Sequence, residues 1–121
     1  ALTCGDSILL AKNANSAWNH YGLVAGYVEV GETLEQAVRR EVMEEVGLPV
    51  RSLRYVGSQP WGVSGSLMCA FQGEADRSLP LKIQRSELAD AKWVSRDQLS
   101  APERTVSVAL EMIERFRQGR L

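Results

Sequence analysis

The sequence lacks the features that mark several common classes of protein. Its two cysteines, Cys4 and Cys69, are far apart and belong to no CxxC pair, which argues against a zinc ribbon within the chain and against a disulfide scaffold. We expect both to be free, buried thiols. No apolar run approaches the ~20 residues of a membrane-spanning helix. The N-terminus has no basic segment followed by an apolar one, so no signal peptide is expected and a cytoplasmic protein is the default.

The chain also lacks an excess of either charge. There are 14 Lys and Arg residues against 15 Asp and Glu residues, a formal net charge of -1. This balance argues against a surface that binds polyanions as a whole, so any contact with nucleic acid would need a local site. What is present is ordinary: 45% hydrophobic residues over 121 positions allow one packed domain over residues 1–121.

Alternating apolar residues and turn-forming residues divide the chain into short strands and two helices. We predict strands over Ser7–Ala11, Gly22–Val30, Val50–Ser58, Gly65–Ala75 and Asp90–Val94, with loops over Lys12–Tyr21 and Gln59–Ser64. Helices are predicted over Thr33–Val46 and Thr105–Arg117, and a single helical turn over Ser95–Leu99. The second helix carries a stripe predicted to be core, formed by Val106, Ala109, Leu110, Ile113 and Phe116. Strands mixed with two helices predict a sheet covered by helices on both faces.

The first helix has clear boundary signals. Thr33 and Gln36 have the spacing of a capping box, and Gly47 occupies the position of a C-terminal glycine. The face that begins with Leu34, Ala37 and Val38 would normally continue as core.

That face instead ends in carboxylates. Glu41 and Glu45 continue it, and Glu44 lies beside them. Like charges at these spacings destabilise a helix by roughly 0.2–0.5 kcal/mol per pair, and they stand at the negative end of the helix dipole. One interpretation is a solvated acidic face balanced by Arg39 and Arg40. The other is a site for Mg²⁺ or Mn²⁺, which prefer hard carboxylate oxygens.

A spaced motif favours the metal site. Gly26 and Glu32 precede the run Arg40-Glu41-Val42-Met43-Glu44-Glu45-Val46-Gly47-Leu48. Nine defined positions across 23 residues match the Nudix box, G-x5-E-x7-R-E-U-x-E-E-x-G-U. The chain therefore resembles the Nudix hydrolase superfamily, which implies an α/β/α sandwich with a central mixed sheet.

The resemblance also implies roles for individual residues. Glu41 and Glu45 are expected as metal ligands, and Glu44 as a ligand or the general base. Arg40 and Glu32 are expected to pair and hold the loop. Main-chain carbonyls of Ala25 and Gly26 would complete the metal shell.

Outside the box, residues from about 7 to 113 resemble the NADH pyrophosphatase family. Gly57-Ser58-Gln59-Pro60-Trp61 and Ser66-Leu67-Met68 are similar to that family's SQPWPFPxS segment. Gly62-Val63-Ser64 departs from it, because two prolines and a phenylalanine are missing, and the loop should be more flexible. The usual N-terminal domain and zinc ribbon are absent too, so the chain is expected to be a short relative or a catalytic fragment.

Substrate contacts are expected from residues near this segment. The resemblance implies Gln59, Pro60, Trp61, Ser66 and Ser107. Tyr27 and Trp61 have rings that can stack on nicotinamide or adenine; the alternative for each is half-buried packing. Trp18 and Trp93 are expected to be packing residues.

The family places a metal-binding Glu shortly before a Trp, and here the aligned position is Asp90, ahead of Trp93. A turn-capping role is the alternative for Asp90, and Glu87 is the fallback ligand.

The expected function is metal-dependent hydrolysis of NADH or NAD⁺ to nicotinamide mononucleotide and AMP. Attack by water would be assisted by the bound ion and by a carboxylate base. Hydrolysis of ADP-ribose or of a modified nucleoside triphosphate is the alternative, and a non-catalytic ligand-binding module is a second. The NAD cap of an RNA is a possible substrate, no membrane partner is expected, and the resemblance implies a homodimer.

Overall fold

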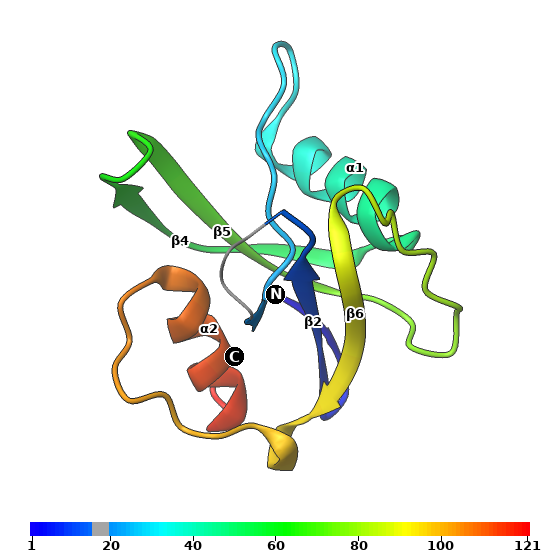
Figure 1. The fold of residues 1–121 in the computed structure, drawn as a ribbon, viewed down its shortest axis with the longest axis vertical. Helices are drawn as coiled ribbons and strands as arrows, with labels where there is room; N and C mark the ends of the chain where they lie inside the picture. Colours follow the sequence, from blue (N-terminus) through cyan, green and yellow to red (C-terminus); the bar gives the residue numbers. More distant parts are fainter. Residues whose placement is uncertain (16–19) are drawn as a thin grey trace.

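A mixed, six-stranded sheet forms the centre of the molecule (Figure 1). The computed structural model describes residues 1–15 and 20–121. Along this part of the chain the elements are β1 (Leu2–Cys4), β2 (Ser7–Asn13), β3 (Tyr21–Gly22), α1 (Leu34–Val46), β4 (Arg51–Trp61), β5 (Ser66–Glu74), β6 (Leu88–Ser95), the 3-10 turn η1 (Arg96–Gln98) and α2 (Val108–Arg117). The strands run in the order β3-β2-β1-β5-β4, and β6 pairs with β2. Among the described strands only β1 and β5 pair in parallel, so the predicted mixed sheet is confirmed.

The two helices cover opposite faces of the sheet, as predicted. Side chains of a strand point alternately to its two faces. In β2, Leu9 and Ala11 pack in a cluster with Val42 and Val46 of α1. Ile8 and Leu10 of the same strand pack in a second cluster that contains Phe116 of α2. Figure 1 shows α1 and α2 on either side of β2, which gives the α/β/α arrangement.

Helix α1 is held at both ends by the predicted signals. The Thr33 hydroxyl accepts a hydrogen bond from the Gln36 N–H at 3.1 Å, and the Gln36 side chain accepts one from the Thr33 N–H at 2.9 Å. At the other end Gly47 has φ 72° and donates to the carbonyls of Met43 and Val42, a left-handed conformation that glycine adopts without steric cost. The helix is therefore fixed in length, and its last turn stands at a defined place.

Three predicted elements were wrong in extent. Residues 23–30 form no strand, and β3 covers only Tyr21–Gly22. The alternation of 22–30 does not mark a buried face, because Val30 is 107% exposed and Tyr27 is 77% exposed. Strand β4 continues to Trp61 through part of the predicted loop. Helix α2 begins at Val108, three residues later than predicted, and Val106 is exposed rather than core.

Other expectations are met or fall outside the described residues. Strand β1 was not predicted. Cys4 and Cys69 are free but half-buried. Trp93 packs against the α1-side cluster, whereas Trp18 lies outside the described residues. Neither helix of the described chain is long and apolar enough to cross a membrane.

Candidate active site

The C-terminal half of α1 presents three carboxylates with very different surroundings. Val42 and Val46 are buried in the core, and this fixes how the last two turns are rotated. As a result Glu45 is turned inward and is 6% exposed. Glu41 is half-buried, and the side chain of Glu44 is 50% exposed. One helix face thus offers a buried, an intermediate and an exposed carboxylate side by side.

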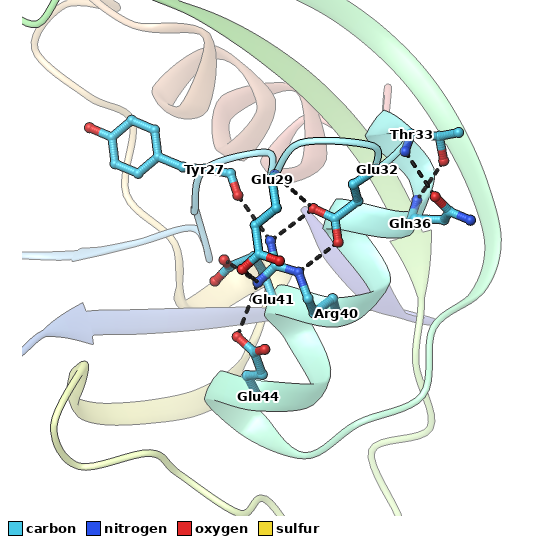
Figure 2. A network of polar contacts seen from close by, with 8 residues as sticks. All are labelled: Tyr27, Glu29, Glu32, Thr33, Gln36, Arg40, Glu41 and Glu44. Atoms are coloured by element: carbon cyan, nitrogen blue, oxygen red, sulfur yellow. Dashed lines mark hydrogen bonds and ion pairs between the residues drawn. The ribbon is translucent and has the colours of Figure 1, made fainter.

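The Arg40 guanidinium connects two of these carboxylates, Glu41 and Glu44, to the preceding loop (Figure 2). Its Nε and Nη2 donate to the two carboxylate oxygens of Glu32 at 2.7 and 3.0 Å. Nη1 donates to Glu41 at 2.8 Å and to Glu44 at 3.1 Å. Nη2 also donates to the main-chain carbonyl of Tyr27 at 3.0 Å. Arg40 therefore fixes both the loop and two of the three helix carboxylates, as the fork shape of a guanidinium allows.

The expected pair of Arg40 and Glu32 is formed and is electrostatically strong. Hydrogen bonds from Arg40, and then one from the Glu29 N–H, lower the pKa of Glu32 to about 2. Hydrogen bonds to Glu32 and Glu41 raise the pKa of Arg40. Glu32 and Arg40 therefore stay charged over the working pH range, and their ion pair keeps the loop attached to the helix.

Glu45 is the uncompensated carboxylate of the site. Burial raises its pKa to about 7, and the charges of Glu41, Glu87 and Glu44 add to this effect. Its Oε2 atom is buried and has no hydrogen-bond partner within the described residues. A buried polar atom without a partner destabilises the folded protein by about 1–3 kcal/mol. At Glu45 the site therefore lacks a compensating positive charge.

Glu87 reaches this site because the segment before β6 folds over the end of α1. The Lys82 N–H donates to the Val46 carbonyl and the Gln84 N–H donates to the Glu45 carbonyl, both at 2.9 Å. These bonds satisfy two carbonyls that the last turn of a helix leaves without partners. Glu87 follows in the same segment, and its N–H donates a hydrogen bond to the Gln84 carbonyl.

The donor set fits a divalent cation. In the described part of the chain no three His, Cys, Asp or Glu side chains are arranged to hold a metal ion; Glu41 and Glu44 turn toward Arg40 instead. The chemistry nevertheless suits Mg²⁺ or Mn²⁺, because the cluster is made of hard carboxylate oxygens. The orphaned Oε2 of Glu45 and the raised pKa are what a cation would relieve.

Gly26 brings the loop backbone against Glu41. A Cβ at Gly26 would lie 2.2 Å from the Glu41 Cδ, so any larger residue there would displace the Glu41 carboxylate from its present position. The main chain of Ala25 and Gly26 therefore passes next to the carboxylate cluster, where carbonyl oxygens were expected to add to the metal shell.

The structure does not bring Asp90 to this cluster. Asp90 pairs with Lys12 in the ladder between β6 and β2, which places it on the α2 side of the sheet, opposite the helix that carries Glu45. Its carboxylate accepts a hydrogen bond from the Tyr21 hydroxyl at 2.6 Å, which lowers the pKa of Asp90. Glu87, the fallback ligand of the sequence analysis, is instead close enough to raise the pKa of Glu45.

A pocket of about 710 Å³ adjoins the cluster. Glu41, Ala25 and Gly26 lie on its lining, so carboxylate and loop backbone stand at its edge. The other walls are mostly apolar, and most of them come from β5, α1, α2 and the loop that follows β3. Such a pocket can enclose a planar base while the charged part of a ligand stays at the rim.

The residues expected to contact substrate fall into two groups. Tyr27, Trp61 and Ser66 line the pocket. Gln59, Pro60 and Ser107 do not belong to the lining. The Gln59 side chain accepts a hydrogen bond from the Val108 N–H at 2.8 Å, and the Ser107 hydroxyl caps α2 by accepting from the Leu110 N–H at 3.2 Å.

Several wall residues were not expected as site residues. They are Val24, Leu34, Val38, Met68, Phe71 and Met112. Helix periodicity marks Leu34 and Val38 as apolar-face residues, but it cannot distinguish a pocket wall from core. The remaining wall residues come together only through strand pairing and helix packing, for which the sequence has no local signal.

Comparisons with known proteins agree with this geometry. A family model described as NUDIX domain matches residues 1–116. The NAD-capped RNA hydrolase NudC of Vibrio vulnificus (strain CMCP6) is 48% identical over 107 residues, which is 88% of this chain and 41% of the relative. The protein of the same name from Escherichia coli O9:H4 (strain HS) is 48% identical over 114 residues, which is 94% of this chain and 44% of the relative. The chain thus spans less than half the length of these curated relatives.

A solved structure supports the fold. The MutT NUDIX hydrolase from Burkholderia pseudomallei superposes with a TM-score of 0.70 at 25% identity, over 93% of this chain and 92% of that one.

Proposed function

The chain belongs to the NUDIX domain family, and from that premise we propose that it is a metal-dependent pyrophosphohydrolase that cuts the diphosphate of NAD(H). The products are nicotinamide mononucleotide, oxidised or reduced, and AMP. The observation that carries the proposal is the carboxylate cluster around Glu45 at the edge of a large apolar pocket. The relatives named NAD-capped RNA hydrolase support the nicotinamide dinucleotide as the ligand, either free or at the end of an RNA.

Carboxylates of α1 hold the cation in this proposal. Glu41 and Glu45 are ligands, Glu44 and Glu87 stand beside them, and the main chain of Ala25 and Gly26 adds carbonyl oxygens. When bound, a divalent ion neutralises the charge of the diphosphate and lowers the pKa of the attacking water.

The residues of the chain then position the reaction. The water oxygen forms a bond to one phosphorus, the bond from that phosphorus to the bridging oxygen breaks, and the second phosphate leaves with the bridging oxygen. Glu44 accepts the proton of the water, because it is more exposed than Glu41 and Glu45. Arg40 and Glu32 keep the loop next to α1 throughout. Tyr27 and Trp61 stack on the base, and the apolar walls exclude water from it.

A product assay tests the function. The protein is incubated with Mg²⁺ or Mn²⁺ and NADH, NAD⁺, ADP-ribose, a nucleoside triphosphate or an NAD-capped RNA, and released AMP and nicotinamide mononucleotide are measured. Glu45→Gln should abolish turnover, whereas Glu35→Gln, on the exposed first turn of the same helix, should leave it unchanged. Preference for ADP-ribose or a triphosphate would replace the NAD(H) assignment. No turnover of any substrate, with tight binding retained, would favour a binding module.

Three further points are proposed: one Nudix domain over residues 1–121, a homodimer, and a cytoplasmic location. Light scattering on the purified protein tests the dimer.

A further inference from the structure

We propose that Gln59 is a positioning residue for the substrate pocket, which it serves by fastening the first turn of α2 to strand β4. The inference rests on the proposed function, because the pocket in question is the one assigned to the base. It departs from the role that the sequence resemblance implied for Gln59, which was direct contact with substrate.

The contact that carries the inference joins two distant parts of the chain. The side-chain oxygen of Gln59 accepts a hydrogen bond from the main-chain N–H of Val108 at 2.8 Å, across 49 positions of sequence. Val108 is the first residue of α2, and its N–H is one of the donors that a helix leaves without an internal partner. Ser107 satisfies a second such donor, the Leu110 N–H. The start of α2 is therefore held by one residue of its own and one residue of the sheet.

The position of this helix start decides the shape of the pocket. Val108, Ala109 and Met112 of α2 line the pocket, as does Met68 of β5. Met68 is the register partner of Gln59, so both side chains project to the same face of the sheet. Gln59 thus reaches from the pocket-facing side of the sheet to the helix without lining the pocket itself.

The chain before α2 offers little other support. Residues 100–106 contain no helix or strand, and Val106 is exposed. Without the hydrogen bond from Val108 to Gln59, the start of α2 would keep its own Ser107 cap but would lose its side-chain hydrogen bond to the sheet. Because bases bind in pockets that are largely preformed, a loosened wall should weaken substrate binding more than it slows the chemical step.

Two variants separate positioning from contact. Gln59→Leu keeps the approximate size but removes the acceptor. Gln59→Glu keeps an acceptor oxygen and removes the amide donors, and its charge is favourable at a helix N-terminus. A positioning role requires only the acceptor, so Gln59→Glu should behave like the wild type. Donation from the Gln59 amide to substrate would make both variants defective.

The first readout is hydrogen exchange at the Val108 amide in the ligand-free protein. We expect exchange to be faster by about tenfold in Gln59→Leu, the size expected for loss of one part-buried hydrogen bond, and unchanged in Gln59→Glu. Amides of β2 report whether the variant remains folded. Equal Val108 protection in wild type and Gln59→Leu would overturn the inference, whatever the enzyme does with NADH.

The second readout is steady-state kinetics with NADH. We expect KM to rise about tenfold in Gln59→Leu for the same loss of one hydrogen bond, with kcat little changed, and Gln59→Glu to restore KM. Ser58→Ala, at the exposed neighbouring position on the other face of β4, is the matched control. A raised KM in both Gln59→Leu and Gln59→Glu would overturn the positioning role in favour of direct contact with substrate. Absence of turnover in the wild type would remove the proposed function, but the exchange result would still decide whether Gln59 holds α2.

Discussion

The two helices begin alike and end differently. Each is capped by a hydroxyl side chain, Thr33 in α1 and Ser107 in α2. Helix α2 then follows the rule for stability, with Arg115 and Arg117 in its last turn, where cations suit the helix dipole. Helix α1 has no basic residue in its last turn and ends in carboxylates instead. Because α2 shows that this chain can place cations at the end of a helix, the carboxylates at the end of α1 indicate a functional site there.

The two helices also differ in how the negative charge of their carboxylates is compensated. In α2, Glu114 is paired with Arg117 of the same helix at 2.6 Å. In α1, Arg40 compensates Glu41 and Glu44, but the buried Oε2 of Glu45 has no hydrogen-bond partner among the residues that the structure describes. The conflict between stability and function is therefore concentrated on Glu45.

The largest effect is expected when a glutamate of α1, Glu45, is replaced by glutamine, and the same replacement of Glu114 in α2 is the comparison. Glu45→Gln should lower kcat/KM by roughly 100-fold or more, because it removes a cation ligand. In the absence of divalent ions and above pH ~7, where Glu45 is charged, it should also raise the free energy of unfolding, since it removes a buried charge that neighbouring carboxylates repel. Glu114→Gln should leave kcat/KM unchanged and should slightly lower the free energy of unfolding, because it weakens the pair with Arg117. Chemical denaturation in EDTA and NADH hydrolysis measure both quantities. A Glu45→Gln protein with full activity would end the metal assignment.

Arginine provides the next contrast. Arg40→Lys keeps the charge but loses the fork that contacts Glu32 through two nitrogens, so kcat/KM should fall about tenfold or more as the loop loosens. Arg117→Lys breaks a similar two-nitrogen contact with Glu114 and should leave kcat/KM unchanged. Equal activity of Arg40→Lys and wild type would show that the network around Arg40 is dispensable for the reaction.

Much of the site could be predicted because its signals are local. The caps of α1, its carboxylate run and the spacing from Gly26 to Leu48 lie within one stretch of chain, where helix periodicity and turn chemistry apply. The same local reasoning gave the order of most elements and the two-sided cover of the sheet. Apolar alternation alone misled the assignment of residues 22–30, because extended backbone does not become a strand without a partner to pair with.

The rest depended on contacts between distant segments. Asp90 was expected as a ligand from its position relative to Trp93, but strand register places it on the other face of the sheet. Glu87, three residues earlier, reaches Glu45 because main-chain hydrogen bonds fold its segment over α1. A shift of a few residues changes the face that a side chain occupies, and no local pattern decides that register.

The pH dependence of the free energy of unfolding tests whether Glu45 is the uncompensated carboxylate of α1. Its pKa in the folded protein is about 7, raised from 4.5, so between these values the folded state binds more protons than the unfolded state. The free energy of unfolding without metal should therefore fall as pH rises from about 4.5 to about 7. Because His20 lines the same small cavity as Glu45, the quantity to measure is the difference between wild type and Glu45→Gln. A difference that stays constant over this range would contradict the buried, protonated Glu45.

The smallest contrast lies in the glycines that follow the two helices. Gly47 and Gly119 share φ 72°, so alanine at either position should cost about 1–2 kcal/mol for the left-handed backbone. At Gly119 a Cβ would meet no atom of a described residue within 4 Å, whereas at Gly47 it would lie 2.7 Å from the Lys82 Cβ. Gly47→Ala should therefore destabilise the protein by about 1 kcal/mol more. It should also lower kcat/KM, because displacing Lys82 moves the segment that carries Glu87. Equal losses of stability and unchanged activity would show that this segment does not need its close contact with α1 to serve the site.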